Sequence, residues 1–261
     1  MARYDFRSPR LYVDAALASG APIALAKPQA HYLSNVLRLK AGDAVLVFNG
    51  RDGEWRAELE SAGKRSTLVA REQIRPQTAP LDLHYLFAPL KHERLDYMVQ
   101  KAVELGAARL QPVLTRHTQV QRVNLERMRA NSIEAAEQCG ILTLPEIAAP
   151  LTFGRMVAAR KPDRLLVFCD EDADVKDPVA ALAVARPGPE SVLPLGAVNA
   201  GGGQPMAVLI GPEGGFAEEE RAALLKLPNI VQLSLGPRIL RADTAAVAAL
   251  ALVQAVLGDW R

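Results

Sequence analysis

The chain has 261 residues, of which 49% are hydrophobic and 23% charged, a balance typical of a folded, soluble protein of one large or two modest domains. The two cysteines, Cys139 and Cys169, have no CxxC spacing and no nearby histidine pair, which argues against a disulfide framework or a zinc site. A reducing cytoplasm is therefore the expected compartment. The longest uncharged apolar run, residues 244–257, is too short to span a bilayer, and no signal segment follows Met1, so we expect no membrane association.

The net charge of +2 is unevenly placed along the chain. Residues 1–75 hold 12 Lys and Arg against 8 Asp and Glu, whereas the remainder holds 19 against 21. The first part is therefore the expected nucleic-acid-binding part, although so small an excess favours RNA binding only slightly.

Residues 1–75 have the pattern of a small β-rich domain. Short strand-like runs cover residues 44–48, 55–59 and 67–70, and the steps Asn49-Gly50 and Asp52-Gly53 between the first two are typical of hairpin turns. A compact set of such strands predicts a small barrel. Prolines at both ends of residues 76–80 then predict a linker.

Residues 80–261 alternate between strand and helix patterns, which predicts an α/β domain with a parallel sheet. Strands are expected at 81–87, 110–114, 165–168, 207–210 and 230–235. Helices are expected up to Gly106 and from about 124 to Gly140, because glycine commonly follows a helix end. The proline- and glycine-rich segment 186–204 is expected to be a mobile loop.

Two glycine-proline turns, 211–215 and 236–241, directly follow the last two expected strands. They should lie at the carboxyl ends of neighbouring buried strands, where open α/β sheets bind ligands. Three carboxylates, Glu218–Glu220, occupy the positive end of the next helix and would repel a phosphate there. With no P-loop and no GxGxxG motif, a ligand with adenine and ribose but no phosphate fits best; the alternative is two ordinary tight turns.

The sequence LIGPEGGF at 209–216 and LSLGPRILRADTAAVAAL at 233–250 resembles the two cofactor-loop motifs of the RsmE family, SPOUT-class methyltransferases that modify N3 of a uridine in 16S ribosomal RNA. Segments 31–50, 90–113 and 132–140 are similar to the family's RNA-binding segment, first catalytic-domain helix and strand, and central helix. The resemblance implies a PUA-like RNA-binding barrel, a SPOUT domain with a trefoil knot, S-adenosyl-L-methionine as cofactor, no metal, and a homodimer.

There are two departures from the family pattern. Ile141 stands where the family usually has arginine, so no role of that arginine can be transferred to this chain. The family's RTETA reads Arg241-Ala242-Asp243-Thr244-Ala245 here, which keeps a carboxylate on a shorter stem.

Arg241 and Asp243 are the expected catalytic residues. Uridine N3 carries a proton that must leave, so Asp243 could accept it if its pKa is raised, or could orient Arg241 to stabilise the uridine anion. The alternatives are that Asp243 is the N-cap of the last helix and that Arg241 or Arg238 holds a phosphate. Glu213 either contacts the cofactor or stabilises the start of the helix that follows it.

Backbone and apolar groups of the two turns are expected to hold the cofactor, and the residues assigned to it are Leu209, Ile210, Gly211, Glu213, Gly214, Leu235, Gly236, Ile239, Leu240 and Ala245. The expected RNA phosphate contacts are Arg38, Lys40, Arg116, Arg122, Arg127 and Arg129. We therefore expect a cytoplasmic rRNA methyltransferase acting on 16S rRNA or the small ribosomal subunit. Two rivals remain open: a non-enzymatic RNA-binding assembly factor, and an α/β enzyme that binds a phosphorylated metabolite.

Overall fold

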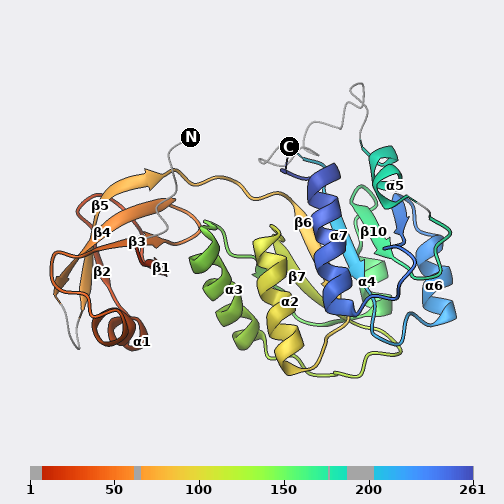
Figure 1. The fold of residues 1–261 in the computed structure, drawn as a ribbon, viewed down its shortest axis with the longest axis horizontal. Coiled ribbons are helices and arrows are strands. Elements are labelled where there is room, and N and C mark those ends of the chain that lie inside the picture. Colours follow the sequence, from red (N-terminus) through yellow and green to blue (C-terminus); the bar gives the residue numbers. More distant parts are fainter. Residues whose placement is uncertain (1–7, 62–65, 176, 187–202, 261) are drawn as a thin grey trace. The chain divides into compact units, whose positions relative to one another are not determined.

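The computed structural model describes residues 8–61, 66–175, 177–186 and 203–260. The chain divides into two compact units, residues 1–79 with 136–144, and residues 80–135 with 145–261 (Figure 1). Residues 136–144, which the sequence placed in the second domain, are thus part of the first unit. Most of the expected loop at 186–204 lies outside the described residues.

The first unit is built on a five-stranded mixed sheet that forms a half-barrel (Figure 1). Its strands, in spatial order, are β1 (Arg10–Tyr12), β3 (Ala44–Phe48), β4 (Glu54–Ser61), β5 (Thr67–Arg75) and β2 (Pro22–Ala24). A short helix α1 (Lys27–His31) continues into a π-helical turn η1 (Tyr32–Val36). The three expected strands are confirmed, whereas β1 and β2, at three residues each, are too short to show an alternating pattern.

The β3–β4 turn is held by the side chain of Asn49. Its Oδ1 accepts hydrogen bonds from the backbone N–H groups of Arg51 and Asp52 at 2.9 and 2.8 Å. Gly50 and Gly53 both have positive φ, 79° and 78°, a conformation that glycine adopts without steric cost. The Asn-Gly and Asp-Gly steps therefore predict the turn because Asn49 binds the turn backbone and both glycines adopt a positive φ.

A buried ion cluster in the first unit binds the end of helix α3 (Leu125–Cys139). Arg10 donates to Glu54 and to the carbonyl of Ala136, and its Nη2 lies 2.7 Å from the carbonyl oxygen of Ile141. Arg75 bonds the same Glu54 carboxylate at 2.7 Å and the carbonyl of Gly140 at 2.8 Å. The two arginines thus bind carbonyls of the last turn of α3 and of the two residues after it, which joins residues 136–144 to this unit.

The second unit contains a parallel sheet in the order β12-β10-β11-β6-β7-β8, with β9 also paired to β7. Its strands are β6 (Leu83–Phe87), β7 (Arg109–Leu114), β8 (Glu146–Ile147), β9 (Leu151–Thr152), β10 (Leu165–Cys169), β11 (Met206–Ile210) and β12 (Ile230–Leu233). All five expected strands are confirmed. The expectation that the two glycine turns follow neighbouring strands is wrong, because β10 lies between β11 and β12.

Helices cover both faces of this sheet (Figure 1). Besides α3 they are α2 (His92–Glu104), α4 (Phe153–Ala159), α5 (Pro178–Val184), α6 (Glu218–Leu225) and α7 (Ala242–Val256). Tyr85 and Phe87 of β6 pack in one core with Leu250 of α7, whereas Leu86 packs in a second core with Leu224 of α6. Alternate strand residues therefore face opposite helix layers.

The expected combination of a small β domain and a parallel α/β domain is confirmed. Among the described helices, none has the length and apolar character needed to cross a membrane.

Candidate active site

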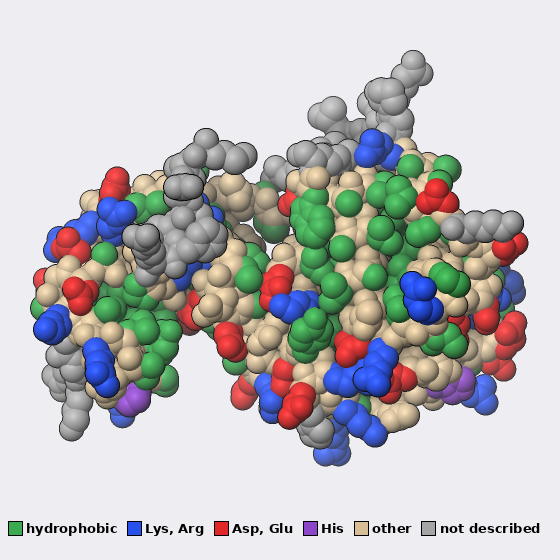
Figure 2. Space-filling model, viewed as in Figure 1, with side chains coloured by type: hydrophobic (Ala, Val, Ile, Leu, Met, Phe, Trp, Pro, Cys, Tyr) green, Lys and Arg blue, Asp and Glu red, His purple; other side chains and the backbone are tan. Residues whose placement is uncertain are grey.

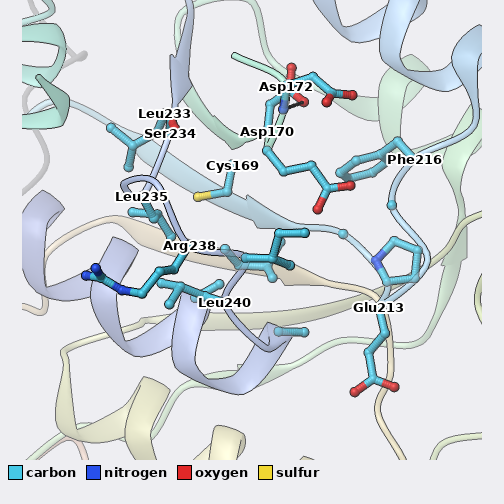
Figure 3. Close-up of a pocket in the computed structure, with 18 of the residues that line it drawn as sticks. Cys169, Asp170, Asp172, Glu213, Phe216, Leu233, Ser234, Leu235, Arg238 and Leu240 are labelled. Atoms are coloured by element: carbon cyan, nitrogen blue, oxygen red, sulfur yellow. Dashed lines mark hydrogen bonds between the residues drawn. The ribbon is translucent and has the colours of Figure 1, made fainter. Parts of the chain in front are cut away.

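A cavity of about 340 Å³ lies at the carboxyl ends of three strands of the second unit (Figure 3). Its wall is formed by residues 169–172 after β10, 210–216 after β11 and 233–240 around the end of β12. Arg221, Ala242 and Ala245 complete it from α6 and α7. The site thus lies where parallel sheets commonly bind ligands.

The loop after β11 depends on glycine at its first position. A Cβ built on Gly211 would lie 2.5 Å from Cε2 of Phe216, so any side chain there would displace this ring. Phe216 in turn packs edge-on against Phe168 at a ring separation of 5.2 Å. Gly211 therefore allows the loop to fold back on an aromatic anchor at the cavity wall.

Of the ten residues expected to bind the cofactor, nine line this cavity. The exception is Leu209, whose side chain is fully buried in the core beneath the loop, beside Phe168. The structure brings the two turns together although their strands are not adjacent.

The end of β10, which sequence reasoning did not assign, also lines the cavity with Cys169, Asp170, Glu171 and Asp172. Burial raises the pKa of the Cys169 thiol to about 12, so this group stays neutral. Asp170 is 7% exposed and accepts hydrogen bonds from Arg221 at 2.9 Å and from Gln232 at 3.0 Å. A run of acidic residues directly after an apolar strand is the sequence signal that would have identified this wall.

Carboxylates outnumber cations on the cavity wall. The wall carries the carboxylates of Asp170, Glu171, Asp172 and Glu213 and the guanidinium groups of Arg221 and Arg238. Asp170 is paired with Arg221 and Glu213 with Arg94 of α2, which leaves Glu171, Asp172 and Arg238 outside these pairs. Figure 3 shows that the side chains of Glu213 and Arg238 extend away from the Cys169 sulfur. Such a wall favours a neutral or cationic ligand over a phosphate.

The first turn of α6 uses part of its acidic charge to cap the helix. Glu220 accepts a hydrogen bond from the backbone N–H of Ala217 at 3.1 Å and another from the backbone N–H of Arg116 at 2.9 Å. The carboxylates of Glu218–Glu220 therefore occupy the positive end of the helix, as the sequence predicts.

Arg94, in the first turn of α2, joins the two cofactor loops and was missed by the sequence reasoning. Its Nε and Nη2 lie 3.0 and 3.2 Å from the two carboxylate oxygens of Asp243, and its Nη1 pairs with Glu213. The hydrogen bonds that Arg94 donates to Asp243 lower the pKa of Asp243, and the hydrogen bonds that it donates to Asp243 and Glu213 raise its own pKa. One guanidinium thus connects the loop after β11 to the start of α7.

The structure corrects the alternative interpretation of Asp243 as a helix cap. Helix α7 begins at Ala242 with Arg241 as the N-cap residue, and Asp243 is the second helical residue. Its Oδ1 accepts a hydrogen bond from the backbone N–H of Thr244 at 2.9 Å. The lowered pKa is also opposite to the raised value that a general base at this position requires. Asp243 is oriented by Arg94, and Arg241 is exposed.

All six expected RNA contacts are exposed: Arg38 and Lys40 in the first unit, and Arg116, Arg122, Arg127 and Arg129 in the second. Arg127 is held by Asp96, with 2.9 Å between its Nε and the nearer carboxylate oxygen. In the described part of the chain, no group of three or more His, Cys, Asp or Glu side chains is placed to hold a metal ion.

A half-barrel combined with a parallel α/β domain and a strand-end cavity defines a two-domain α/β protein with a ligand site, and comparison with protein families identifies the class as RNA methyltransferases. Residues 25–69 match the RNA methyltransferase PUA domain, and residues 77–254 match the RNA methyltransferase domain. The chain belongs to the family of ribosomal RNA small subunit methyltransferase E. The resemblance to the RsmE family is thereby confirmed.

Individual relatives match over most of the chain. The ribosomal RNA small subunit methyltransferase E of Rickettsia conorii is 31% identical over 94% of both chains, and that of Synechocystis sp. is 34% identical over 91% of this chain and 74% of the relative. A methyltransferase of Legionella pneumophila, solved with bound S-adenosylmethionine, is 29% identical and superposes with a TM-score of 0.77 over 95% of this chain and 98% of the neighbour. These matches favour the enzyme over a non-enzymatic assembly factor. The trefoil knot stays a prediction of the family.

Proposed function

We propose that this protein binds S-adenosylmethionine in the strand-end cavity and methylates N3 of a uridine in 16S ribosomal RNA. The observation that carries the proposal is the acidic cavity formed by the two glycine-proline turns and the end of β10. Its volume of about 340 Å³ suits a small cofactor. Support also comes from the Legionella pneumophila relative, which was solved with this cofactor.

The cavity residues fit the chemistry of that cofactor. It carries a sulfonium, an ammonium and one carboxylate, so its net charge is +1, and it has no phosphate. The excess of carboxylates over guanidinium groups on the wall suits such a ligand. When bound, S-adenosylmethionine supplies an electrophilic methyl group. The glycine turns and the apolar side chains of Leu235, Ile239 and Leu240 hold the adenine and ribose.

We assign different roles to the two expected catalytic residues. A carboxylate whose pKa is lowered is a weak base, so Asp243 acts as a positioning residue, held by Arg94 at 3.0 Å. Arg241 is exposed at the start of α7, next to the cavity residues Leu240 and Ala242, and its guanidinium stabilises negative charge on the uracil oxygens as the N3 proton leaves. Correct placement of the N3 atom then supplies most of the rate enhancement.

The half-barrel and the exposed arginines would dock 16S rRNA or the small ribosomal subunit in the cytoplasm. A homodimer is also part of the proposal. Apolar side chains gather on the face of the second unit that carries α7 (Figure 2), where Val247, Leu252 and Ala255 are partly or fully exposed. Such a face suits symmetric packing against a second copy.

The test is transfer of a labelled methyl group from S-adenosylmethionine to 16S rRNA and to small subunits from cells that lack the enzyme. Nuclease digestion and mass spectrometry then locate the label. We expect 3-methyluridine at one position and no transfer by Gly211→Val, in which the loop at Phe216 is displaced. Label on another base or ring atom would refute the N3 assignment, and no transfer to either substrate would refute the proposed activity.

A further inference from the structure

A second cavity, of about 380 Å³, lies on one face of the same sheet at the amino-terminal half of its strands. We call it the amino-edge cavity; it is lined by Asp82, His84, Leu86, Arg109, Gln111, Leu151, Met156, Ala159, Arg160, Lys161, Arg164, Leu166 and Ala207. Strand register places Leu166, Ala207, His84 and Arg109 in one row across β10, β11, β6 and β7. The cavity shares no lining residue with the candidate active site.

The cavity has an apolar floor. Leu86, Leu166 and Ala207 of the sheet and Met156 of α4 belong to one buried core cluster, and Leu151 packs against it. Helix α4 has only seven residues and ends at Ala159, which itself lines the cavity. A short helix therefore leaves a cavity over the amino-terminal half of this sheet face, and the side chains of its floor are buried.

The rim of the cavity is basic. Arg164 is paired with Asp82, with 2.7 and 2.8 Å between guanidinium and carboxylate, and Arg109 lies 2.8 Å from Glu146. Arg160 instead donates only to backbone: its Nη2 bonds the carbonyls at positions 164, 228 and 229. Two of the four cations are thus neutralised by carboxylates.

Arg160 and Lys161 supply the charge that remains. In the described residues, the buried Nε of Arg160 has no hydrogen-bond partner, and no carboxylate forms an ion pair with Arg160 or Lys161. Lys161 is exposed at the rim, and Asp163 acts on Arg160 only at longer range. The buried Nε is enclosed by the protein, so what Arg160 and Lys161 offer a ligand is positive charge without a paired carboxylate, which suits an anionic group.

The pKa of His84 depends on the charges of the cavity wall around it. Burial, together with the positive charges of Arg164, Arg109 and Lys161, lowers its pKa to about 4, against the opposing effect of Asp82. Its imidazole, whose Nε2 lies 3.1 Å from an Asp82 oxygen, is therefore neutral at physiological pH. The cavity wall thus keeps a net positive charge without the histidine.

We propose that the amino-edge cavity binds a nucleotide, with its phosphate at Arg160 and Lys161 and its base on the floor of Leu86, Met156 and Leu166. Arginine and lysine are the common protein ligands of phosphate, and a flat ring matches an apolar floor. The volume of about 380 Å³ is within the range of small-molecule sites. The same chemistry could come from a free mononucleotide or from a nucleotide within RNA.

The test is calorimetric titration of cytidine 5′-monophosphate, which matches neither the adenosine of the proposed cofactor nor the uridine of the proposed substrate. The active-site cavity is kept filled with S-adenosylmethionine, and a parallel titration without it keeps the result independent of the proposed function. Lys161→Gln should weaken binding at least about fivefold, roughly 1 kcal/mol. Lys226→Gln is the matched control, because Lys226 is also exposed but does not line the cavity.

A second readout locates the ligand. The chain has only four histidines, so the ring proton signal of His84 can be assigned by its loss in His84→Gln, and this signal should shift on addition of the nucleotide. Competition by a short single-stranded RNA assigns the site to RNA, whereas binding of the mononucleotide alone assigns it to a free nucleotide. Absence of binding, equal binding of cytidine without phosphate, or equal effects of Lys161→Gln and Lys226→Gln would each overturn the proposal.

Discussion

Replacing Arg94 by glutamine should loosen the cofactor site without unfolding the protein. The guanidinium binds both oxygens of Asp243 and also pairs with Glu213, so its loss leaves two carboxylates close together without a cation. The side chains of Arg94, Asp243 and Glu213 are 33%, 17% and 46% exposed, so solvent screens part of the interaction. We expect a loss of about 1 to 2 kcal/mol in unfolding free energy, less than for a fully buried pair.

The effect on cofactor binding should be larger than the effect on stability. Arg94 connects the loop that carries Glu213 to the start of α7, so the cavity wall would lose its preorganised shape. We expect S-adenosylmethionine to bind roughly tenfold more weakly, which is about 1.4 kcal/mol. Isothermal titration measures the affinity, and urea unfolding measures the stability of the same variant.

A double-mutant cycle with Asp243→Asn separates the ion pair from other effects of the substitution. If the ion pair carries the coupling, the double variant should lose about 1 kcal/mol less binding free energy for S-adenosylmethionine than the sum of the losses in the two single variants. Arg94→Lys is the matched control that keeps the charge but loses the two-pronged geometry, and it should recover only part of the affinity. Wild-type affinity in Arg94→Gln, or a coupling energy near zero, would refute this reasoning.

Four further predictions follow from individual contacts and surfaces. Arg241→Ala should lower the single-turnover methylation rate at least about tenfold at unchanged cofactor affinity, and a normal rate would remove its assigned role. The pKa of His84 falls to about 4 on folding, so its contribution to the unfolding free energy should be fully present above the usual pKa near 6.5 and should decline by up to about 3 kcal/mol as the pH falls to 4. His84→Gln should flatten this part of the pH profile of urea unfolding. An unchanged profile would contradict the assignment. Glu54→Gln leaves the buried Arg10 guanidinium without its carboxylate and should cost about 3 kcal/mol in urea unfolding, so a loss below about 1 kcal/mol would show that the cluster matters little. Light scattering should show a dimer, and a species at the 28.2 kDa chain mass alone would refute it.

Local signals in the sequence predicted the elements well because their cause is local. Gly106 and Gly140 have φ of 80° and 71° and follow the ends of α2 and α3, as expected for glycine at such positions. The apolar runs at 165–168 and 207–210 are buried strands, since both faces of the sheet are covered.

Contacts between distant segments could not be predicted in the same way. The insertion of β10 between β11 and β12 depends on the path of the chain, which no local period encodes, and it brings the carboxylates after Cys169 into the cavity wall. Arg94 and Asp243 are 149 residues apart, and neither side chain alone signals the other. The lowered pKa of Asp243 follows from that pairing, so the sequence could not decide between its candidate roles.

The acidic wall of the active-site cavity has a consequence for selectivity among metabolites. Adenosine triphosphate shares adenine and ribose with the proposed cofactor, but its phosphates would enter a cavity whose wall carries Glu171 and Asp172 besides the paired carboxylates of Asp170 and Glu213. Like charges in a partly enclosed site repel strongly, whereas a sulfonium is attracted. Glu171 and Asp172 would therefore weaken the binding of adenine nucleotides, which would otherwise compete with the cofactor for the cavity.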